Sequence, residues 1–396
     1  MKILIYLENL HRGGVDTFII NLINFWPKKN DKFIILSNKN HPAIDYIKLN
    51  IGNKHQVIPF NIPLYNELIK KIPNIFITKI ALRVSLLIYQ YFLLKRILIK
   101  IRANALIVAN GGYPGGDSSR LANIVWKRLG NSNNIHNVHN LAVEPKGFLI
   151  SKFENIFDLL LQKSVDNFVC VSKVSLKYLR KRKNLSQIKN ITYIYHGLNS
   201  KKKKSNIILR KLIKIKKDEK ICLVLATYER RKGHFFLIKA FKEALKIRND
   251  LHLVFAGHRN KNDESYFNNL KTFKNDKIHF LDFVPLATSL ITQSDIVLIG
   301  SQEYESFGLV ALEAMMLKIP VITTNLEAFK EVLGKENSEN VIQKNNHKSF
   351  SNQIIKILND KKYKNKSIEK GYKRANTLFN PSEMSLKYYN LITFKK

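Results

Sequence analysis

The feature that most constrains the fold of this chain is a repeated alternation of short apolar runs with segments of helical periodicity. In the first half, amphipathic segments such as 16–25 and 152–162 lie between several of these runs. Strands that alternate with helices form a parallel sheet covered on both faces. The strands expected in this half are 2–7, 32–36, 105–109, 134–138, 167–172 and 191–195.

Four consecutive lysines, residues 201–204, interrupt the pattern and predict an exposed linker, because like charges in a row do not pack. A second α/β half follows, with helices expected at 234–245, 286–293 and 309–317. The last 45 residues read as helical with a break at Asn380-Pro381. The strands expected in this half are 221–226, 251–256, 277–281, 295–299 and 320–323. The chain length of 396 residues fits two such domains, at 1–200 and 201–378.

Several features predict a cytoplasmic protein. The two cysteines, Cys170 and Cys222, lie inside apolar runs, which indicates buried thiols in a reducing compartment. The first strand begins at Lys2, too early and too briefly apolar for a signal peptide. No run of 18 uncharged apolar residues is present, so no membrane span is expected.

A formal charge of +37 would attract phosphates, nucleic acid or anionic lipid, although a Lys-, Asn- and Ile-rich composition explains it equally well. Segment 80–94 is almost wholly apolar, with Lys79, Arg83 and Gln90 on one narrow helical face. A buried core helix is the favoured interpretation. The alternative is an in-plane membrane anchor whose following basic residues lie at the headgroups, because Lys95, Arg96, Lys100 and Arg102 come next.

The strongest local signal is Glu305 followed eight residues later by Glu313, at the transition from a strand to a helix. A helix N-terminus attracts phosphate through its free N–H groups, and Ser306 is a candidate cap. Gly308 lets the backbone approach a ligand closely. Two carboxylates on either side of these amides could bind the hydroxyl groups of a sugar diphosphate.

This motif resembles the E-x7-E signature of the retaining glycosyltransferases of family 4, also called glycosyl transferases group 1. The resemblance covers most of the chain and extends to segments 166–172, 232–241, 253–257, 295–298, 313–315, 318–322 and 331–332. It implies the GT-B type of fold, in which two Rossmann-like domains face each other across a cleft. The first domain would bind the acceptor and the second the donor, and helix 379–396 would cross back to the first.

The resemblance also implies roles for residues of the second domain. Glu305 would contact the donor sugar, Glu313 the nucleotide ribose, and Lys232 the diphosphate as it leaves. The family commonly has arginine where this chain has Thr227, so Arg230 or Arg231 would have to supply that charge. The other donor-binding residues expected around the motif are Phe307, Gly308 and Leu309.

In the first domain, three loops that follow strands are candidates for acceptor binding. Gly13 and Gly14 open a helix and match a paired glycine in the family. A glycine-rich loop that contains Gly111, Gly112 and Tyr113 follows another strand. The family places a histidine near the reacting sugar at the position of His139, with His136 a weaker candidate.

The sequence lacks an Asp-x-Asp pair, which predicts that cationic side chains and a helix dipole replace a divalent metal at the diphosphate. No cofactor is expected. The predicted function is transfer of a sugar from a nucleotide-sugar donor to a glycan or lipid-linked acceptor in polysaccharide or glycolipid biosynthesis. Contact with the anionic inner face of the membrane would be reversible. The alternatives are a sugar-nucleotide epimerase of the same fold and a nucleic-acid-binding protein, which the dispersed charge disfavours.

Overall fold

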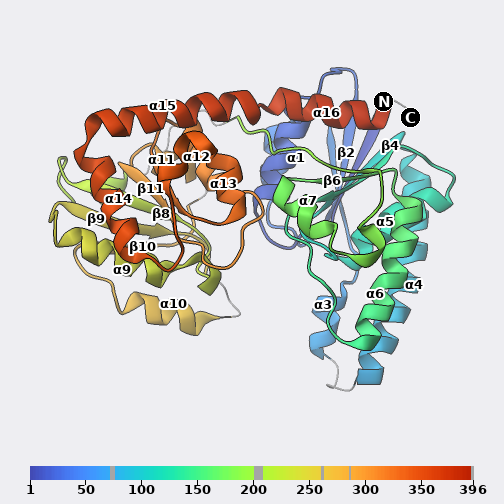
Figure 1. The fold of residues 1–396 in the computed structure, drawn as a ribbon. Helices are drawn as coiled ribbons and strands as arrows, with labels where there is room; N and C mark the ends of the chain where they lie inside the picture. Colours follow the sequence, from blue (N-terminus) through green and yellow to red (C-terminus); the bar gives the residue numbers. More distant parts are fainter. Residues whose placement is uncertain (72–75, 200–207, 260–262, 285–286, 394–396) are drawn as a thin grey trace. The chain divides into compact units, whose positions relative to one another are not determined.

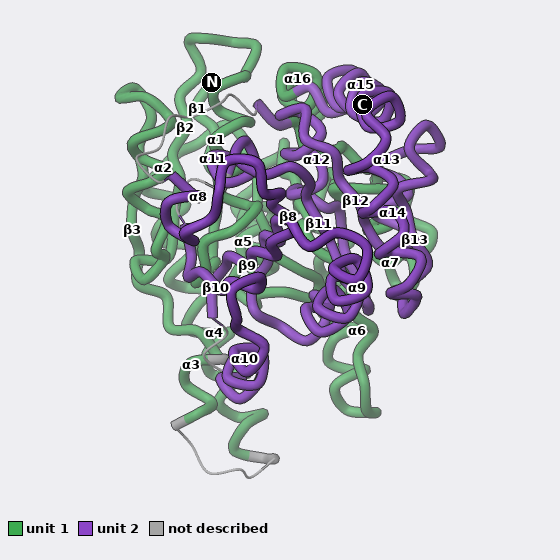
Figure 2. Tube along the Cα trace, turned by 90° about the vertical axis from the view of Figure 1, so that its left-hand side faces the viewer, with its two compact units in different colours: residues 1–197, 381–396 green, residues 198–380 purple. Residues whose placement is uncertain are grey.

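A computed structural model describes residues 1–71, 76–199, 208–259, 263–284 and 287–393 (Figure 1). The chain forms two compact units, which Figure 2 distinguishes by colour. Unit 1 comprises Met1–Gly197 and Pro381–Lys396, and unit 2 comprises Leu198–Asn380. The linker predicted at 201–204 lies outside the described residues.

Unit 1 contains a seven-stranded sheet in the order β3-β2-β1-β4-β5-β6-β7, and every neighbouring pair is parallel. Six of its strands were predicted. The sequence missed β3, an edge strand whose residues are mostly exposed and therefore do not form an apolar run. The strands are β1 (Lys2–Leu7), β2 (Lys32–Asn38), β3 (Gln56–Phe60), β4 (Ala105–Asn110), β5 (Asn134–Val138), β6 (Asn167–Cys170) and β7 (Ile191–Tyr193).

Helices cover both faces of this sheet, and strand residues alternate between two cores. Leu4 and Tyr6 pack with α4, α5 and α6, whereas Ile3 and Ile5 pack with α1, α2 and α16. This period of two is that of an extended strand buried on both sides. The helices of unit 1 are α1 (Gly14–Asn24), α2 (Ile44–Ile51), α3 (Tyr65–Leu68), η1 (Ile69–Lys71), α4 (Phe76–Ile101), α5 (Asp117–Arg128), α6 (Phe148–Ser164), α7 (Lys173–Leu179), η2 (Lys183–Leu185) and α16 (Pro381–Thr393).

Unit 2 contains a six-stranded parallel sheet in the order β10-β9-β8-β11-β12-β13. Its strands are β8 (Lys220–Leu225), β9 (Leu251–Ala256), β10 (Ile278–Leu281), β11 (Ile296–Ile299), β12 (Val321–Thr324) and β13 (Val341–Ile342). Its helices are α8 (Leu209–Leu212), η3 (Arg230–Lys232), α9 (His234–Leu245), α10 (Glu264–Lys271), α11 (Ala287–Ile291), α12 (Leu309–Met316), α13 (Glu327–Leu333), η4 (Lys335–Asn340), α14 (His347–Asn359) and α15 (Lys361–Leu378). Two parallel Rossmann-like sheets confirm the predicted fold class.

Each sheet has one topological switch point, where the strand order reverses. In unit 1 it lies between β1 and β4, and in unit 2 between β8 and β11. At such a point the loops that leave two neighbouring strands run in opposite directions, which opens a crevice at the carboxyl ends of the strands. The candidate ligand-binding loops are therefore the four that follow β1, β4, β8 and β11.

Helix α4 contradicts the preference for a deeply buried helix at 80–94. Its polar residues face the protein, because Gln90 is buried and Arg83 forms ion pairs with Asp117 and Glu154. Leu86, Leu94 and Leu98 are buried, but six other apolar residues of this helix are exposed, at Ile80, Val84, Ile88, Tyr89, Phe92 and Ile99. No described helix has the length and apolar character needed to span a bilayer.

Helix α15 ends just before the predicted break, and Pro381 is the first residue of α16. Proline lacks the N–H that a helix interior needs and is well suited to a first turn. Met384, Tyr388 and Ile392 are buried in the core of unit 1 against α1 and the sheet. Both cysteines are buried and unbridged, as the apolar runs predicted.

Candidate functional site

The switch point of unit 2 brings together Lys232 and Glu305, which lie 73 residues apart in the sequence. Lys232 Nζ donates a hydrogen bond to Glu305 Oε2 at 2.6 Å, and both side chains are about one-sixth exposed. The loops after β8 and β11 approach each other closely because Gly233 has a positive φ of 68° and no side chain. A Cβ at Gly233 would lie 1.9 Å from the carbonyl oxygen of Gly300. The pair is therefore held by the fold and remains accessible to a ligand.

Helix α12 begins immediately after this pair. Gly308 precedes its first residue with a φ of 99°, and a Cβ there would lie 2.9 Å from the ring of Phe329. The cap is thus Gly308 and not the predicted Ser306, and no side chain caps the helix. Phe307 is buried against Phe379, so its side chain belongs to the core of unit 2 and does not line a donor site.

Glu313 lies in the second turn of α12 and is half-buried. Burial raises the pKa of its carboxyl to about 7. The carboxyl group itself has no hydrogen bond to any part of the chain that the structure describes. A carboxylate that loses water without gaining a partner destabilises the folded state, which makes Glu313 a candidate for ligand binding.

If Glu313 accepts hydrogen bonds from ribose hydroxyls, donor affinity should rise with pH, because the ionised carboxylate is the stronger acceptor. Affinity is expected to increase by at most about tenfold per pH unit below the Glu313 pKa, and to level off above it. Isothermal titration of the donor between pH 5.5 and 8.5 measures this, and Glu313→Gln should give a flat profile.

The same shift has a consequence for stability. The pKa of Glu313 is higher in the folded state than in the unfolded state. Its contribution to the free energy of unfolding is therefore greatest below about pH 4.5 and is lost as the pH rises through about 7. The melting temperature of Glu313→Gln relative to the wild type should therefore increase over that range. A constant difference would contradict a raised pKa.

Of the two arginines expected to replace the family arginine, only Arg231 is directed toward the loop of Glu305. It stacks over the ring of Tyr304 at 5.0 Å, and its carbonyl accepts a hydrogen bond from the backbone N–H of Gln302. Arg230 instead pairs with Asp263 and is mostly exposed. Thr227 is half-buried in the loop after β8 and carries no charge.

The paired glycines of unit 1 are held at the start of α1. The Gly13 N–H donates to Asp16 Oδ2 at 2.8 Å, and His41 Nε2 lies 2.8 Å from Asp16 Oδ1. Gly13 is exposed and Gly14 half-buried, which leaves the backbone of this loop accessible. His41, which comes from the loop after β2, was not among the predicted site residues.

The glycine-rich loop after β4 is fixed at two points. Tyr113, predicted to line the acceptor site, is buried and donates a hydrogen bond to Asp158 at 2.6 Å. Its role is therefore to hold the loop. Asp117, where α5 begins, pairs with Arg83 and with the fully buried Arg120. Gly111 and Gly112, which come directly before Tyr113, remain partly exposed.

A network of buried charges surrounds this loop, and sequence analysis did not predict it. Arg120 also pairs with Glu154 at 2.7 Å, and Arg182 pairs with Asp158 at 2.7 Å. The network contains three cations and three anions, which is the condition under which buried charges are tolerated. Its members are Arg83, Arg120, Arg182, Asp117, Glu154 and Asp158.

His139 directly follows β5 and is buried beside Phe18 and His196. Its Nδ1 lies 3.4 Å from His196 Nε2, whereas its Nε2 has no hydrogen-bond partner in the described part of the chain. Burial and the neighbouring His196 hold the pKa of His139 well below its usual value, so the ring is neutral at pH 7. His136 hydrogen-bonds Asn110 and Asn123, which is a structural role.

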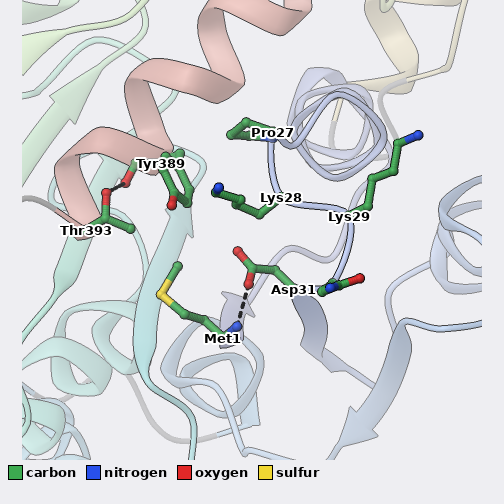
Figure 3. Close-up of a pocket in the computed structure, with 8 residues that line it drawn as sticks. Met1, Pro27, Lys28, Lys29, Asp31, Tyr389 and Thr393 are labelled. Carbon is green, nitrogen blue, oxygen red and sulfur yellow. Dashed lines mark hydrogen bonds and ion pairs between the residues drawn. The ribbon is translucent and has the colours of Figure 1, made fainter.

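An open hollow of about 360 Å³ lies elsewhere in unit 1, between the start of β1 and helix α16 (Figure 3). Met1, Asp31 and Tyr389 line it, together with exposed Lys28 and Lys29. It is at the amino ends of the strands, opposite the loops that bind ligands in sheets of this kind. Within the described residues, no cluster of His, Cys, Asp or Glu is arranged to hold a metal ion.

Comparison with known proteins agrees with this geometry. The fold is that of HepE (Alr3699) from Anabaena, whose crystal structure in complex with UDP and glucose has a TM-score of 0.77 and 14% identity, with both chains covered completely. Two parallel Rossmann-like sheets, one in each unit, define the GT-B class of fold.

The sequence comparisons find glycosyltransferases as well. Residues 205–374 match the family model described as glycosyl transferases group 1. The chain is also similar in part to the glycosyltransferase MJ1607 of Methanocaldococcus jannaschii, at 31% identity over 43% of this chain and 45% of that protein. The capsular polysaccharide biosynthesis glycosyltransferase CapM of Staphylococcus aureus is 24% identical over 72% of this chain and 76% of its own length. Residues 205–374, which make up most of unit 2, therefore match the glycosyl transferases group 1 family, and the chain spans about half the length of the first curated relatives that it matches.

Proposed function

We propose that this protein is a retaining glycosyltransferase that uses a nucleotide-sugar donor. The observation that carries the proposal is the ion pair of Lys232 and Glu305, placed at the switch point of unit 2 beside the N-terminus of α12. The pair offers a cation for a diphosphate and a carboxylate for sugar hydroxyls in one accessible place. Glu313 in the second turn of the same helix offers a second carboxylate.

In this mechanism, binding of the donor breaks the ion pair between Lys232 and Glu305. Lys232 Nζ moves from Glu305 to a diphosphate oxygen, where it neutralises charge that develops as the bond to the sugar breaks. The free N–H groups of the first turn of α12 bind the same diphosphate. Glu305 then accepts hydrogen bonds from the sugar, Glu313 those of the ribose, and Arg231 adds a second cation.

Unit 1 binds the acceptor through the loops after β1 and β4. Gly13, Gly14, Gly111 and Gly112 present accessible backbone there, and His139 has an unused ring nitrogen for a sugar hydroxyl. The acceptor is a glycan or a lipid-linked sugar of a surface polysaccharide or glycolipid. CapM, which is similar over most of its length, is described as acting in capsular polysaccharide biosynthesis.

The test begins with a thermal-shift screen of UDP-, GDP- and ADP-sugars, because a ligand that binds only the folded state raises its melting temperature. The stabilising donor is then incubated with acceptor glycosides, and the product is analysed by NMR. Transfer with retained anomeric configuration, lost in Glu305→Ala and Glu313→Ala and unaffected by EDTA, is expected. Release of an epimerised nucleotide sugar would instead assign the epimerase activity.

We further propose that unit 1 binds the inner face of the cytoplasmic membrane reversibly. The exposed apolar face of α4 continues into four exposed basic residues, Lys95, Arg96, Lys100 and Arg102. Helix α6, which contacts α4 through Arg83 and Glu154, also has exposed apolar residues, at Phe148, Leu149, Ile150, Ile156, Leu159 and Leu160. Apolar side chains beside lysines and arginines suit the boundary between acyl chains and anionic headgroups.

Flotation with liposomes of graded anionic lipid content measures this binding. It should require anionic lipid and weaken at high salt, since screening shortens the range of the charges. Phe92→Ser should reduce binding by about tenfold, because the side chain no longer transfers apolar area into lipid. Leu49→Ser on α2, at a position of unit 1 that is 85% exposed against 63% for Phe92, is the control and should bind like the wild type. Equal binding by both variants would contradict the proposal.

A further inference from the structure

Glu8 follows β1 directly and lies at the switch point of unit 1, where the mechanism above assigns it no role. Its carboxyl oxygen Oε2 accepts three hydrogen bonds from the first residues of α5: from Ser118 Oγ at 2.5 Å, from the Ser119 N–H at 3.0 Å and from Ser119 Oγ at 3.3 Å. The other oxygen, Oε1, has no hydrogen bond to any described residue. The side chain is only half-buried. One oxygen is thus anchored while the second is free for a ligand.

The position of this carboxyl depends on the glycine loop after β4. A Cβ at Gly116 would lie 2.0 Å from Glu8 Oε2 and 2.2 Å from Oε1, so only glycine leaves room for the group. On the neighbouring residue, Asn9 Oδ1 would be 3.2 Å from a Cβ at Gly111. The loops after β1 and β4 therefore meet at Glu8 and Asn9, with the exposed backbone of Gly111 and Gly112 beside them.

The surroundings indicate which ligand the free oxygen suits. The positive end of α5 lies at the carboxyl and disfavours a cationic ligand there. The charged neighbour of Glu8 is Asp117, which is neutralised by its ion pairs with Arg83 and Arg120. Burial raises the pKa of Glu8, as expected for a carboxyl that is partly withdrawn from water. A neutral hydroxyl donor fits both conditions.

We propose that Glu8 is a specificity-determining residue that accepts a hydrogen bond from an acceptor hydroxyl through Oε1. The inference deepens the proposed transferase function and rests on it. A polyhydroxylated acceptor, such as the terminal sugar of a glycan, is the chemical class it selects. A hydrogen bond to a charged group discriminates by about tenfold to a hundredfold against an acceptor that lacks the hydroxyl.

The competing interpretation is that Glu8 only caps α5. Glu8→Gln separates the two, because the amide oxygen still accepts from Ser118 and Ser119 while the free oxygen becomes an NH₂ group. The experiment uses the full-length protein, the donor that stabilises it, and p-nitrophenyl glycosides of glucose, galactose, mannose and N-acetylglucosamine. It compares KM for the acceptor, KM for the donor, the rate of donor hydrolysis and the melting temperature.

Glu8→Gln should raise the acceptor KM by about tenfold to a hundredfold and leave the donor parameters and the melting temperature unchanged. A deoxy-glycoside that lacks the hydrogen-bonded hydroxyl should be an equally poor acceptor, with the same high KM, for the wild type and for Glu8→Gln. Glu67→Gln, a change of the same kind at an exposed position of unit 1, is the control. Glu8→Asp keeps the charge, but its shorter side chain moves the carboxylate away from the acceptor, so this variant should also raise the acceptor KM.

Three results would overturn the inference. They are a wild-type acceptor KM in Glu8→Gln, a fall in melting temperature that accounts for the lost activity in both variants, and an equal effect on donor KM. A wild-type enzyme that transfers no sugar would instead refute the transferase function itself, so the two failures are distinguishable.

Discussion

Replacing Lys232 by alanine is expected to lower kcat for sugar transfer by about 10²–10³-fold, the cost typical of removing one group that stabilises developing negative charge. Lys232 is the cation that the structure holds at Glu305, 2.6 Å away at the switch point of unit 2. Steady-state kinetics with the donor found by thermal shift measures the effect. Lys232→Arg, which keeps the charge, should recover part of the rate.

Lys239→Ala is the control for this experiment, since Lys239 is exposed on α9 in the same unit. The melting temperature should change little in either alanine variant, because an ion pair that is accessible to water contributes little to stability. A Lys232→Ala enzyme with the wild-type kcat would contradict the proposed role. Equal losses in both alanine variants would point to a general effect of charge on this basic protein.

Alanine at Gly233 is expected to destabilise unit 2 strongly. A left-handed backbone costs a non-glycine residue about 1–2 kcal/mol. In addition, the new Cβ would lie 1.9 Å from the Gly300 carbonyl, so the loops after β8 and β11 would have to separate. The variant should therefore lose more than about 2 kcal/mol of unfolding free energy, together with the spacing of Lys232 and Glu305.

Gly130→Ala separates the clash from the cost of a positive φ, because Gly130 has a φ of 79° and no atom within 4 Å of its Cβ position. Both tryptophans, Trp26 and Trp126, lie in unit 1, so fluorescence follows that unit alone. Hydrogen exchange of peptides from β8 and β11, measured by mass spectrometry, reports on unit 2. Similar exchange in Gly233→Ala and the wild type would contradict the close approach.

Much of the fold could be predicted because strands buried on both faces form continuous apolar runs. Eleven of the thirteen strands were found in this way, and the two missed were β3 and the two-residue β13, at sheet edges. The pairing of Lys232 with Glu305 follows from topology, since β8 and β11 are adjacent but distant in sequence.

Other features depend on partners that no local pattern reveals. The sequence predicts that Arg83 and Gln90 share one face of a mostly apolar helix, but not that Arg83 forms ion pairs with Asp117 and Glu154, 34 and 71 residues further along the chain. The fixing of Tyr113 by Asp158 and the anchoring of Glu8 by Ser118 likewise join distant segments. These loops could be identified as candidate binding loops because they directly follow strands. The contacts within them could be seen only in the structure.

The return of the chain into unit 1 at Pro381 affects how the protein folds during synthesis. Tyr388 fills the core of unit 1 and accepts a hydrogen bond from Asn137 at 2.6 Å, and Ser385 donates to the carbonyl of Leu22. At about 5–20 residues per second, the ribosome delivers α16 roughly 10–40 s after the end of the first segment. During that interval unit 1 exposes the apolar surface that α16 later covers, so unit 2 can complete its fold before the unit that precedes it.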